Sequence, residues 1–168
     1  NDRTSDFKVK IMKKIDNIFF KKKILIYGLG KSGISAYNFL RQKAKVNLFD
    51  DNSQNNFRFD KKSLSFIKIL KCDFDFIIIS PGIDLSKCKL SKYLKQNSSK
   101  VYTDFDVFYS FFSNDSVTIT GTNGKSTTAK LLYDVLRDQK KDARLVGNIG
   151  NPILSEKKIT KKTFFVIE

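Results

Sequence analysis

The sequence of 168 residues predicts an α/β fold built on parallel sheets. Short apolar runs recur along the chain, and stretches with a helical spacing of apolar residues separate them. The runs are continuous rather than alternating with polar residues, which is typical of parallel strands that helices cover on both faces. The expected strands span residues 24–27, 46–49, 76–79, 101–102, 117–120, 143–146 and 164–168.

The segments between these strands predict helices and loops. Polar residues 52–62 are expected to form a loop, and residues 1–22 a basic lead-in with a short helix. A domain boundary is expected between residues 104 and 105. Because a parallel sheet rarely ends on a strand without a crossover helix, residues 105–168 are expected to be only part of a domain. The expected helices follow residue 30, include Tyr93 and Leu94, span 105–112, and run through Leu131 and Leu136.

The composition excludes several kinds of site, and we expect a cytoplasmic monomer. Only two cysteines and no histidine are present, so a disulfide framework and a Cys/His zinc site are excluded. No apolar stretch reaches the ~20 residues of a membrane span, and we expect no membrane partner. The net charge of +15 comes from scattered lysines without an aromatic–basic motif, so we expect no nucleic-acid partner.

The turn at residues 121–127 predicts a phosphate-binding loop for ATP. It follows the buried strand expected at 117–120 and opens a helix, so that backbone N–H groups can point into a concavity for phosphate oxygens. Lys125 would reach the β- and γ-phosphates, and Ser126 would bind Mg²⁺. The loop is shorter than the common P-loop, and the alternative is a helix-capping turn that happens to contain Gly and Lys. The expected ATP-binding residues are Gly121, Thr122, Asn123, Gly124, Lys125, Ser126 and Thr127.

A second glycine pattern, Gly28-x-Gly30-x-x-Gly33, follows the first strand and precedes a helix. This spacing is that of a dinucleotide-binding turn and predicts a Rossmann-like first domain. Asp50 ends the next strand and could accept a hydrogen bond from a ribose hydroxyl. Three interpretations stay open: NAD or NADP, another nucleotide diphosphate, or glycines that serve only helix–strand packing. The phosphate loop that follows this domain favours the second, because a dehydrogenase would carry a substrate domain there.

Together these motifs resemble those of the Mur ligases, the ATP-dependent amide ligases of peptidoglycan synthesis. Within that family the D-glutamate-adding ligases are most similar, because Ser126 and Thr127 follow the lysine and a Ser-Pro-Gly-Ile segment lies upstream. The resemblance implies a Rossmann-like domain for the UDP-linked substrate at residues 1–104, followed by the first part of a P-loop ATPase-type domain at 105–168. The matching segments are 28–35, 79–83, 119–127 and 147–150.

The resemblance also implies which residues make the sites. Glu168 would bind Mg²⁺ together with Ser126, and Asn148 would contact the muramoyl-alanine end of the substrate. Lys125, Asn148 and Glu168 are the expected catalytic residues. Position 51 more often holds a small hydroxyl residue in this family, so Asp51 departs from the pattern. The residues implied to bind the UDP-linked substrate are Gly28, Gly30, Lys31, Ser32, Gly33, Asp50, Asp51, Ser80, Pro81, Gly82 and Asn148.

The implied reaction joins D-glutamate to UDP-N-acetylmuramoyl-L-alanine, with ATP and Mg²⁺. ATP would phosphorylate the substrate carboxylate, and the D-glutamate amine would attack the acyl phosphate, while Lys125 stabilises charge on the transferred group. The family's carbamylated lysine, its histidine and its third domain have no counterpart in these residues, so the chain alone is expected to be inactive. Two alternatives stay open: another Mur or folylpolyglutamate-type ligase, and a dinucleotide-binding oxidoreductase or regulatory module.

Overall fold

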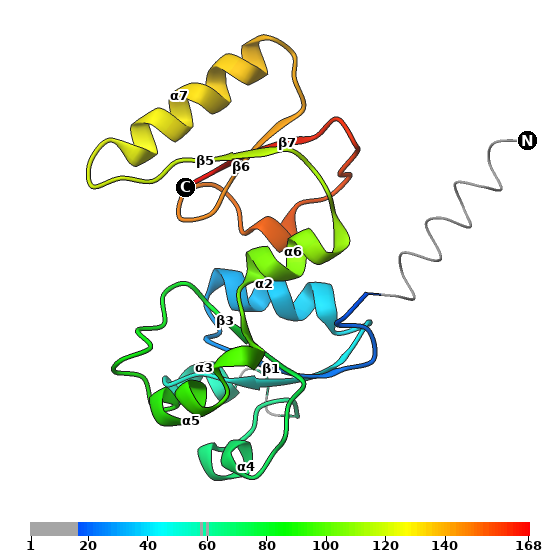
Figure 1. The fold of residues 1–168 in the computed structure, drawn as a ribbon, viewed down its shortest axis with the longest axis vertical. Coiled ribbons are helices and arrows are strands. Elements are labelled where there is room, and N and C mark those ends of the chain that lie inside the picture. The colour runs from blue at the N-terminus through cyan, green and yellow to red at the C-terminus, as the bar shows by residue number, and fades with distance from the viewer. Residues whose placement is uncertain (1–16, 58, 60) are drawn as a thin grey trace, which may run out of the picture. The chain divides into compact units, whose positions relative to one another are not determined.

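The computed structural model describes residues 17–57, 59 and 61–168. The chain divides into two compact units, with the division between Phe111 and Phe112. Each unit holds one parallel sheet with helices, so the predicted α/β class with parallel sheets is confirmed (Figure 1). Most of the lead-in in which a short helix was expected, residues 1–16, lies outside the described residues, and Ile18 and Phe19 lie in a turn. None of the helices in the described part of the chain has the length and hydropathy that crossing a bilayer requires.

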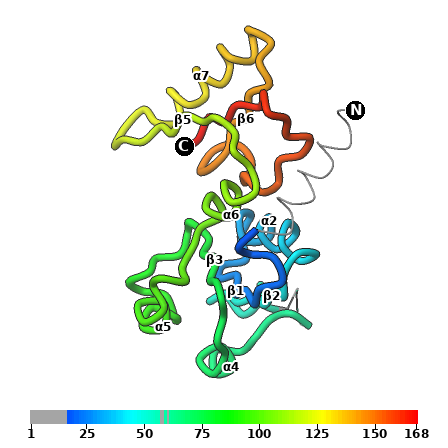
Figure 2. Tube along the Cα trace, turned by 45° about the vertical axis from the view of Figure 1, so that its right-hand side comes forward, coloured from blue at the N-terminus to red at the C-terminus, as the bar shows by residue number. Residues whose placement is uncertain are grey.

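The sheet of the first unit has four parallel strands in the order β2-β1-β3-β4. Its register sets Tyr27, at the end of β1, beside Phe49 and Ile79. The carboxyl ends of three strands therefore meet at one edge. Figure 2 shows β1, β2 and β3 close together from a second direction. The strands are β1 (Lys23–Tyr27), β2 (Lys45–Phe49), β3 (Phe76–Ile79) and β4 (Val101–Tyr102).

Helices cover both faces of this sheet, α2 on one and α4 and α5 on the other (Figure 1). The second face is the larger apolar core, in which Leu25, Tyr27 and Ile77 of the strands pack with Ile69 of α4 and Leu94 of α5. All five side chains are buried, and for the three strand residues this agrees with the continuous apolar runs. The helices are α2 (Lys31–Leu40), α3 (Ser53–Phe57), α4 (Phe66–Leu70), α5 (Ser91–Gln96) and α6 (Asp104–Phe111), with a 3₁₀ turn η1 (Ser98–Lys100).

The loop expected over 52–62 is partly wrong, because α3 occupies its first half. Asn52 starts this helix by accepting a hydrogen bond from the Gln54 amide through its side chain, at 3.0 Å. Asn56 exchanges two hydrogen bonds with the backbone of Asp50, at 2.9 and 2.8 Å, which ties the helix to the end of β2. These polar side chains satisfy backbone groups, so a segment without apolar periodicity still forms a helix.

Helix α6 belongs to the first unit, whereas the sequence placed it after the domain boundary. Its last residue, Phe111, stacks edge-on against Phe39 of α2, with ring centroids 5.1 Å apart. At the start of the unit, Asn17 donates to the Ser110 carbonyl at 2.9 Å. Aromatic packing on α2 therefore sets the division between the units after this helix.

The second unit has three parallel strands in the order β5-β7-β6. Phe165 and Val166 of the central strand are fully buried. The strand before the phosphate loop was expected to be buried, and this is wrong, since β5 is an edge strand with Ser116 and Thr118 exposed. The elements are β5 (Ser116–Thr118), α7 (Lys125–Asp138), β6 (Ala143–Val146), a 3₁₀ turn η2 (Ile153–Ser155) and β7 (Phe164–Ile167).

We predict that Gly33→Ala strongly destabilises the first unit, while Gly30→Ala does not. A Cβ at residue 33 would overlap the Gly28 carbonyl oxygen, whereas a Cβ at residue 30 meets nothing within 4 Å. Overpacking against backbone costs about 2–3 kcal/mol, and the Gly30 variant should stay within about 0.5 kcal/mol of wild type. Urea unfolding of the three proteins measures both effects. Equal stability of the two variants would contradict the close packing of α2 on the Gly28 turn.

Candidate nucleotide-binding sites

The phosphate loop of the second unit connects β5 to α7, in the strand–turn–helix order that the sequence predicted. Gly124 is the residue before the helix and has φ +75°, a left-handed conformation that L side chains rarely adopt. Its carbonyl accepts the Thr128 amide at 2.9 Å, which begins the helix. No side chain of the described residues caps this end, so the N–H groups of the first turn are open to an anion.

Three of the predicted side chains meet beside this loop. Ser126 donates its hydroxyl to Glu168 Oε2 at 2.9 Å, and the Asn148 side-chain amide donates to Oε1 at 3.3 Å. The Asn148 backbone amide also donates to the Glu168 carbonyl at 2.8 Å. Parallel pairing of β5, β7 and β6 brings residues from three loops to one edge of the sheet.

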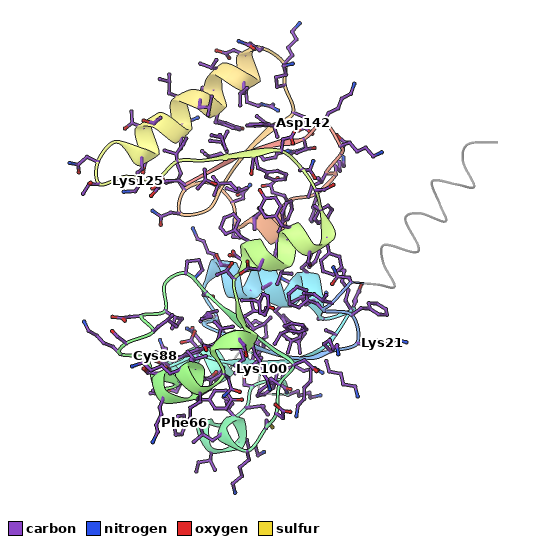
Figure 3. The ribbon with its side chains drawn as sticks, in the orientation of Figure 1. Lys21, Phe66, Cys88, Lys100, Lys125 and Asp142 are labelled. Carbon is purple, nitrogen blue, oxygen red and sulfur yellow. The ribbon has the colours of Figure 1, made fainter. Side chains whose placement is uncertain are left out.

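Lys125 is the first residue of α7 and lies beside the loop (Figure 3). Among the described residues its ammonium reaches the Thr122 carbonyl alone, at 3.4 Å, which is a long hydrogen bond. The remaining members of the predicted ATP set, Gly121, Asn123 and Thr127, are exposed. The loop therefore holds a cation near its open amides, and no acid in the described part of the chain forms an ion pair with it.

The Gly147–Gly150 turn approaches the neighbouring backbone so closely that it needs glycine at both ends. A Cβ at Gly147 would overlap the Glu168 carbonyl, and one at Gly150 the Leu145 carbonyl. Both glycines also have positive φ, at +111° and +79°. This approach sets the position of Asn148 against Glu168.

A polar network that the sequence analysis missed supports the same turn. The Asn151 side chain donates to Glu156 at 2.9 Å, and Arg144 pairs with Glu156 at 3.5 Å and with Asp142 at 3.0 Å. The Glu156 side chain is only 6% exposed, so its charge depends on these partners. Asp142 also accepts the Thr163 hydroxyl at 2.6 Å. No spacing in the sequence marks these residues, because they come from β6 and from the loops around it.

Glycines in the first unit form the turn between β1 and α2. Gly28 has φ +92°, and a Cβ there would lie 2.9 Å from Cβ of Ser80. The Ser80 hydroxyl donates to the Gly28 carbonyl at 2.8 Å, which joins the two predicted segments. The N-terminus of α2, at Gly30, carries no side-chain cap from the described residues. Lys31, at the start of α2, is exposed. Pro81 and Gly82, which follow Ser80, are exposed as well.

The carboxylate of Asp50 is already engaged by the backbone. One oxygen accepts the Leu29 amide at 2.5 Å, and the other accepts the Asn52 amide at 2.8 Å. Asp50 therefore braces the glycine turn against the end of β2. Each oxygen keeps a second lone pair that a ligand hydroxyl could use.

Asp51 has a structural role in this chain. Its carboxylate accepts the Tyr27 hydroxyl at 2.7 Å and the Lys89 amide at 3.2 Å, and its carbonyl accepts the Lys89 ammonium at 2.7 Å. Burial of Tyr27, together with the bonds to Asp51 and Cys88, raises the pKa of that phenol, which stays protonated as a donor. Tyr27 and Lys89 were not predicted, since an apolar run and a lysine-rich loop give no sign of this contact.

The Ser32 side chain also has a partner within the chain, because it hydrogen-bonds the side chain of Asp104. Asp104 is only 4% exposed and also accepts the Phe105 amide at 3.1 Å. Burial raises the pKa of this carboxyl above its ordinary value. A ligand phosphate would therefore meet the backbone amides at the start of α2 before the Ser32 hydroxyl.

The residues present fit a magnesium ion at Glu168. In the described ranges there is no group of three or more His, Cys, Asp or Glu side chains that could hold a metal. The chain would instead give one carboxylate and the Ser126 hydroxyl, which already meet at 2.9 Å. Mg²⁺ is commonly held by one or two carboxylates, with phosphate and water oxygens completing its shell.

A separate hollow of about 470 Å³ lies beside α5, and none of the predicted site residues lines it. Its walls are mostly apolar. The lining residues are Leu85, Ser86, Ser91, Leu94, Lys95, Ser98 and Val101.

Comparison with known families matches both units. Residues 22–101 match the family described as Mur ligase MurD-like, N-terminal domain, and residues 119–168 match the Mur ligase middle domain. The resemblance read from the motifs is thereby confirmed at the level of the family. The two matched ranges lie on either side of the division between the units.

Curated relatives carry the name UDP-N-acetylmuramoylalanine--D-glutamate ligase. The protein of Rickettsia bellii is 34% identical over 154 residues, which is 88% of this chain and 34% of the relative. That of Caldicellulosiruptor bescii is 33% identical over 160 residues, 88% of this chain and 35% of the relative. That of Francisella philomiragia is 36% identical over 140 residues, which is 80% of this chain and 31% of the relative. The chain thus spans about a third of the length of the relatives it matches.

We predict that Asp104→Asn removes a pH dependence of stability that wild type shows above pH 3.8. The buried Asp104 has a raised pKa, so the unfolded chain releases this proton first as the pH rises. The free energy of unfolding of wild type should therefore fall, relative to that of the variant, from pH 3.8 through the folded pKa. Urea unfolding at several pH values measures the difference. Asp138→Asn, at an exposed position, should run parallel to wild type.

Proposed function

The chain belongs to the Mur ligase family, and we propose that it is the part of an ATP-dependent amide ligase that holds ATP and the UDP-linked substrate. The substrates are UDP-N-acetylmuramoyl-L-alanine and D-glutamate, as the names of the relatives state for those proteins. The proposed product is the amide, formed through an acyl phosphate. The observation that carries the proposal is the meeting of Ser126, Glu168 and Asn148 beside an uncapped helix N-terminus.

ATP phosphates are proposed to lie on the Gly121–Gly124 turn, against the open amides of α7. Lys125 would leave its long bond to Thr122 and neutralise charge on the β- and γ-phosphates, which positions the γ-phosphoryl group for attack by a carboxylate. Bound Mg²⁺ would polarise the phosphate oxygens. Glu168 and Ser126 are proposed to hold it, because they already present two oxygens to one point.

Asn148 has two parts in this proposal. Its backbone amide donates to the Glu168 carbonyl and its side chain to the Glu168 carboxylate, so it positions that residue beside the loop. It is also proposed to orient the muramoyl-alanine end of the substrate, for which its side-chain carbonyl oxygen remains available. The Asn151–Glu156–Arg144 network keeps the turn that carries it in place.

The UDP moiety is proposed to bind at the carboxyl end of the first sheet. The amides at the start of α2 suit the diphosphate, with Lys31 adding positive charge at the same end of the helix. Gly28, Gly33 and Ser80 shape the turn beneath it. Asp50 keeps lone pairs for a hydroxyl or imide N–H, whereas Asp51 is committed to Tyr27 and Lys89.

Binding of UDP-N-acetylmuramoyl-L-alanine by the purified chain tests this assignment. Calorimetric titration should give saturable binding that UDP competes for, and NADH should give none. Lys31→Ala should weaken binding about tenfold, because it removes one charge beside the diphosphate. Lys45→Ala, at the opposite end of the sheet, is the matched control and should bind as wild type. Binding of NADH in place of the UDP-sugar would overturn the proposal.

Removal of the loop lysine tests the ATP site. Lys125→Ala should weaken Mg-ATP binding about 10–100-fold, because a charge-assisted contact to the phosphates is lost. Fluorescent ATP titration measures the change. Lys130→Ala is the control on the same helix, since that lysine pairs with Asp134 at 2.6 Å and lies outside the predicted phosphate loop. Unchanged affinity in Lys125→Ala, with wild-type circular dichroism, would contradict this phosphate site.

A further inference from the structure

Helix α4 presents apolar side chains to solvent on one side. Phe66, Ile67 and Leu70 are 40%, 65% and 49% exposed, while Ile69 points into the core. Positions i, i+1 and i+4 fall within about 100° around a helix, so the three exposed side chains share one face. Isolated exposed apolar residues are ordinary, but three on a single turn form a local patch.

Lysines precede and follow these apolar residues in the sequence. The segment 61–71 contains Lys61, Lys62, Lys68 and Lys71 and no acidic residue, and all four lysines are exposed. None of the ion pairs formed between described residues uses them. The flanking acids in the sequence are Asp60 and Asp73, and Asp73 is paired with Lys100 at 2.6 Å. The segment thus exposes both apolar side chains and lysines.

We propose that this basic apolar patch, defined by residues 61–71, binds the surface of an anionic lipid bilayer. The combination suits an interface, since apolar side chains enter the acyl boundary while lysines meet lipid phosphates. A protein partner is disfavoured by area, because a stable interface buries about 800 Å² on each side, which three side chains on one turn do not supply. Figure 1 shows α4 at the far end of the first unit, projecting beyond the sheet and α5.

The proposal concerns peripheral contact and is independent of the nucleotide sites. It departs from the expectation of no membrane partner, which rested on the lack of an apolar stretch long enough to span a bilayer. With one helical turn inserted and four lysines near the surface, binding should be weak, reversible and sensitive to salt.

Vesicle cosedimentation of the full chain tests the proposal. Wild type should sediment with vesicles rich in phosphatidylglycerol at low salt, and not with pure phosphatidylcholine vesicles. Ile67→Ser should lower the partition coefficient by about tenfold, because an apolar side chain no longer enters the boundary. Lys68→Glu should lower it at low salt, and the difference from wild type should shrink in about 0.5 M salt.

Leu131→Ser on α7 is the matched control. Leu131 is 64% exposed, close to the 65% of Ile67, but it lies in the second unit next to the Lys130–Asp134 pair. This variant should bind vesicles as wild type does. Failure of wild type to bind anionic vesicles, equal binding to neutral ones, or equal losses in Ile67→Ser and Leu131→Ser would each overturn the proposal. Unchanged UDP-sugar and ATP binding in Ile67→Ser separates this outcome from a failure of the proposed function.

Discussion

The backbone of residue 33 in α2 packs directly on the Gly28 carbonyl, with no space for a side chain between them. The same constraint recurs in the second unit, where Gly147 packs on the Glu168 carbonyl and Gly150 on that of Leu145. In both units, close contacts between backbone atoms fix a polar turn at the carboxyl end of a parallel sheet. A side chain at any of these three positions would push apart the groups that the proposed ligands need together, so the geometry of both sites depends on these contacts.

Much of this arrangement could be predicted because glycine spacing and apolar runs are local signals. The four strands of the first sheet, the turn after β1 and the start of α7 at Lys125 all follow from residues adjacent in sequence. Helix α3 could not be predicted, because Asn52 and Asn56 stabilise it through bonds to nearby backbone rather than through apolar periodicity. The exposure of β5 was also missed, since an edge strand and a central strand have similar sequences when both contain Val and Thr.

The supporting side chains of the sites lay beyond prediction for a different reason. Tyr27, Asp51 and Lys89 come from β1, the end of β2 and the loop before α5, and only the pairing of strands brings them together. Arg144, Glu156 and Asn151 are likewise gathered by the fold of the second unit. Sequence motifs mark residues that face a ligand through a single turn. Residues that hold those turns in place without facing the ligand form no comparable motif in the sequence.

At the two sites, the hydrogen-bond donors around each carboxylate determine whether it can bind a cation. Asp50 and Asp51 each accept donors from the chain itself on both oxygens, and Asp104 is buried with a raised pKa. These three acids brace turns and helices. Glu168 differs, because its donors are a hydroxyl and an amide side chain that can rotate away, and it is only half-buried at a strand end. Among the acids at these two sites, Glu168 is therefore the one whose bonds to the chain can be exchanged for bonds to a cation, which is the property that the proposed phosphoryl transfer requires.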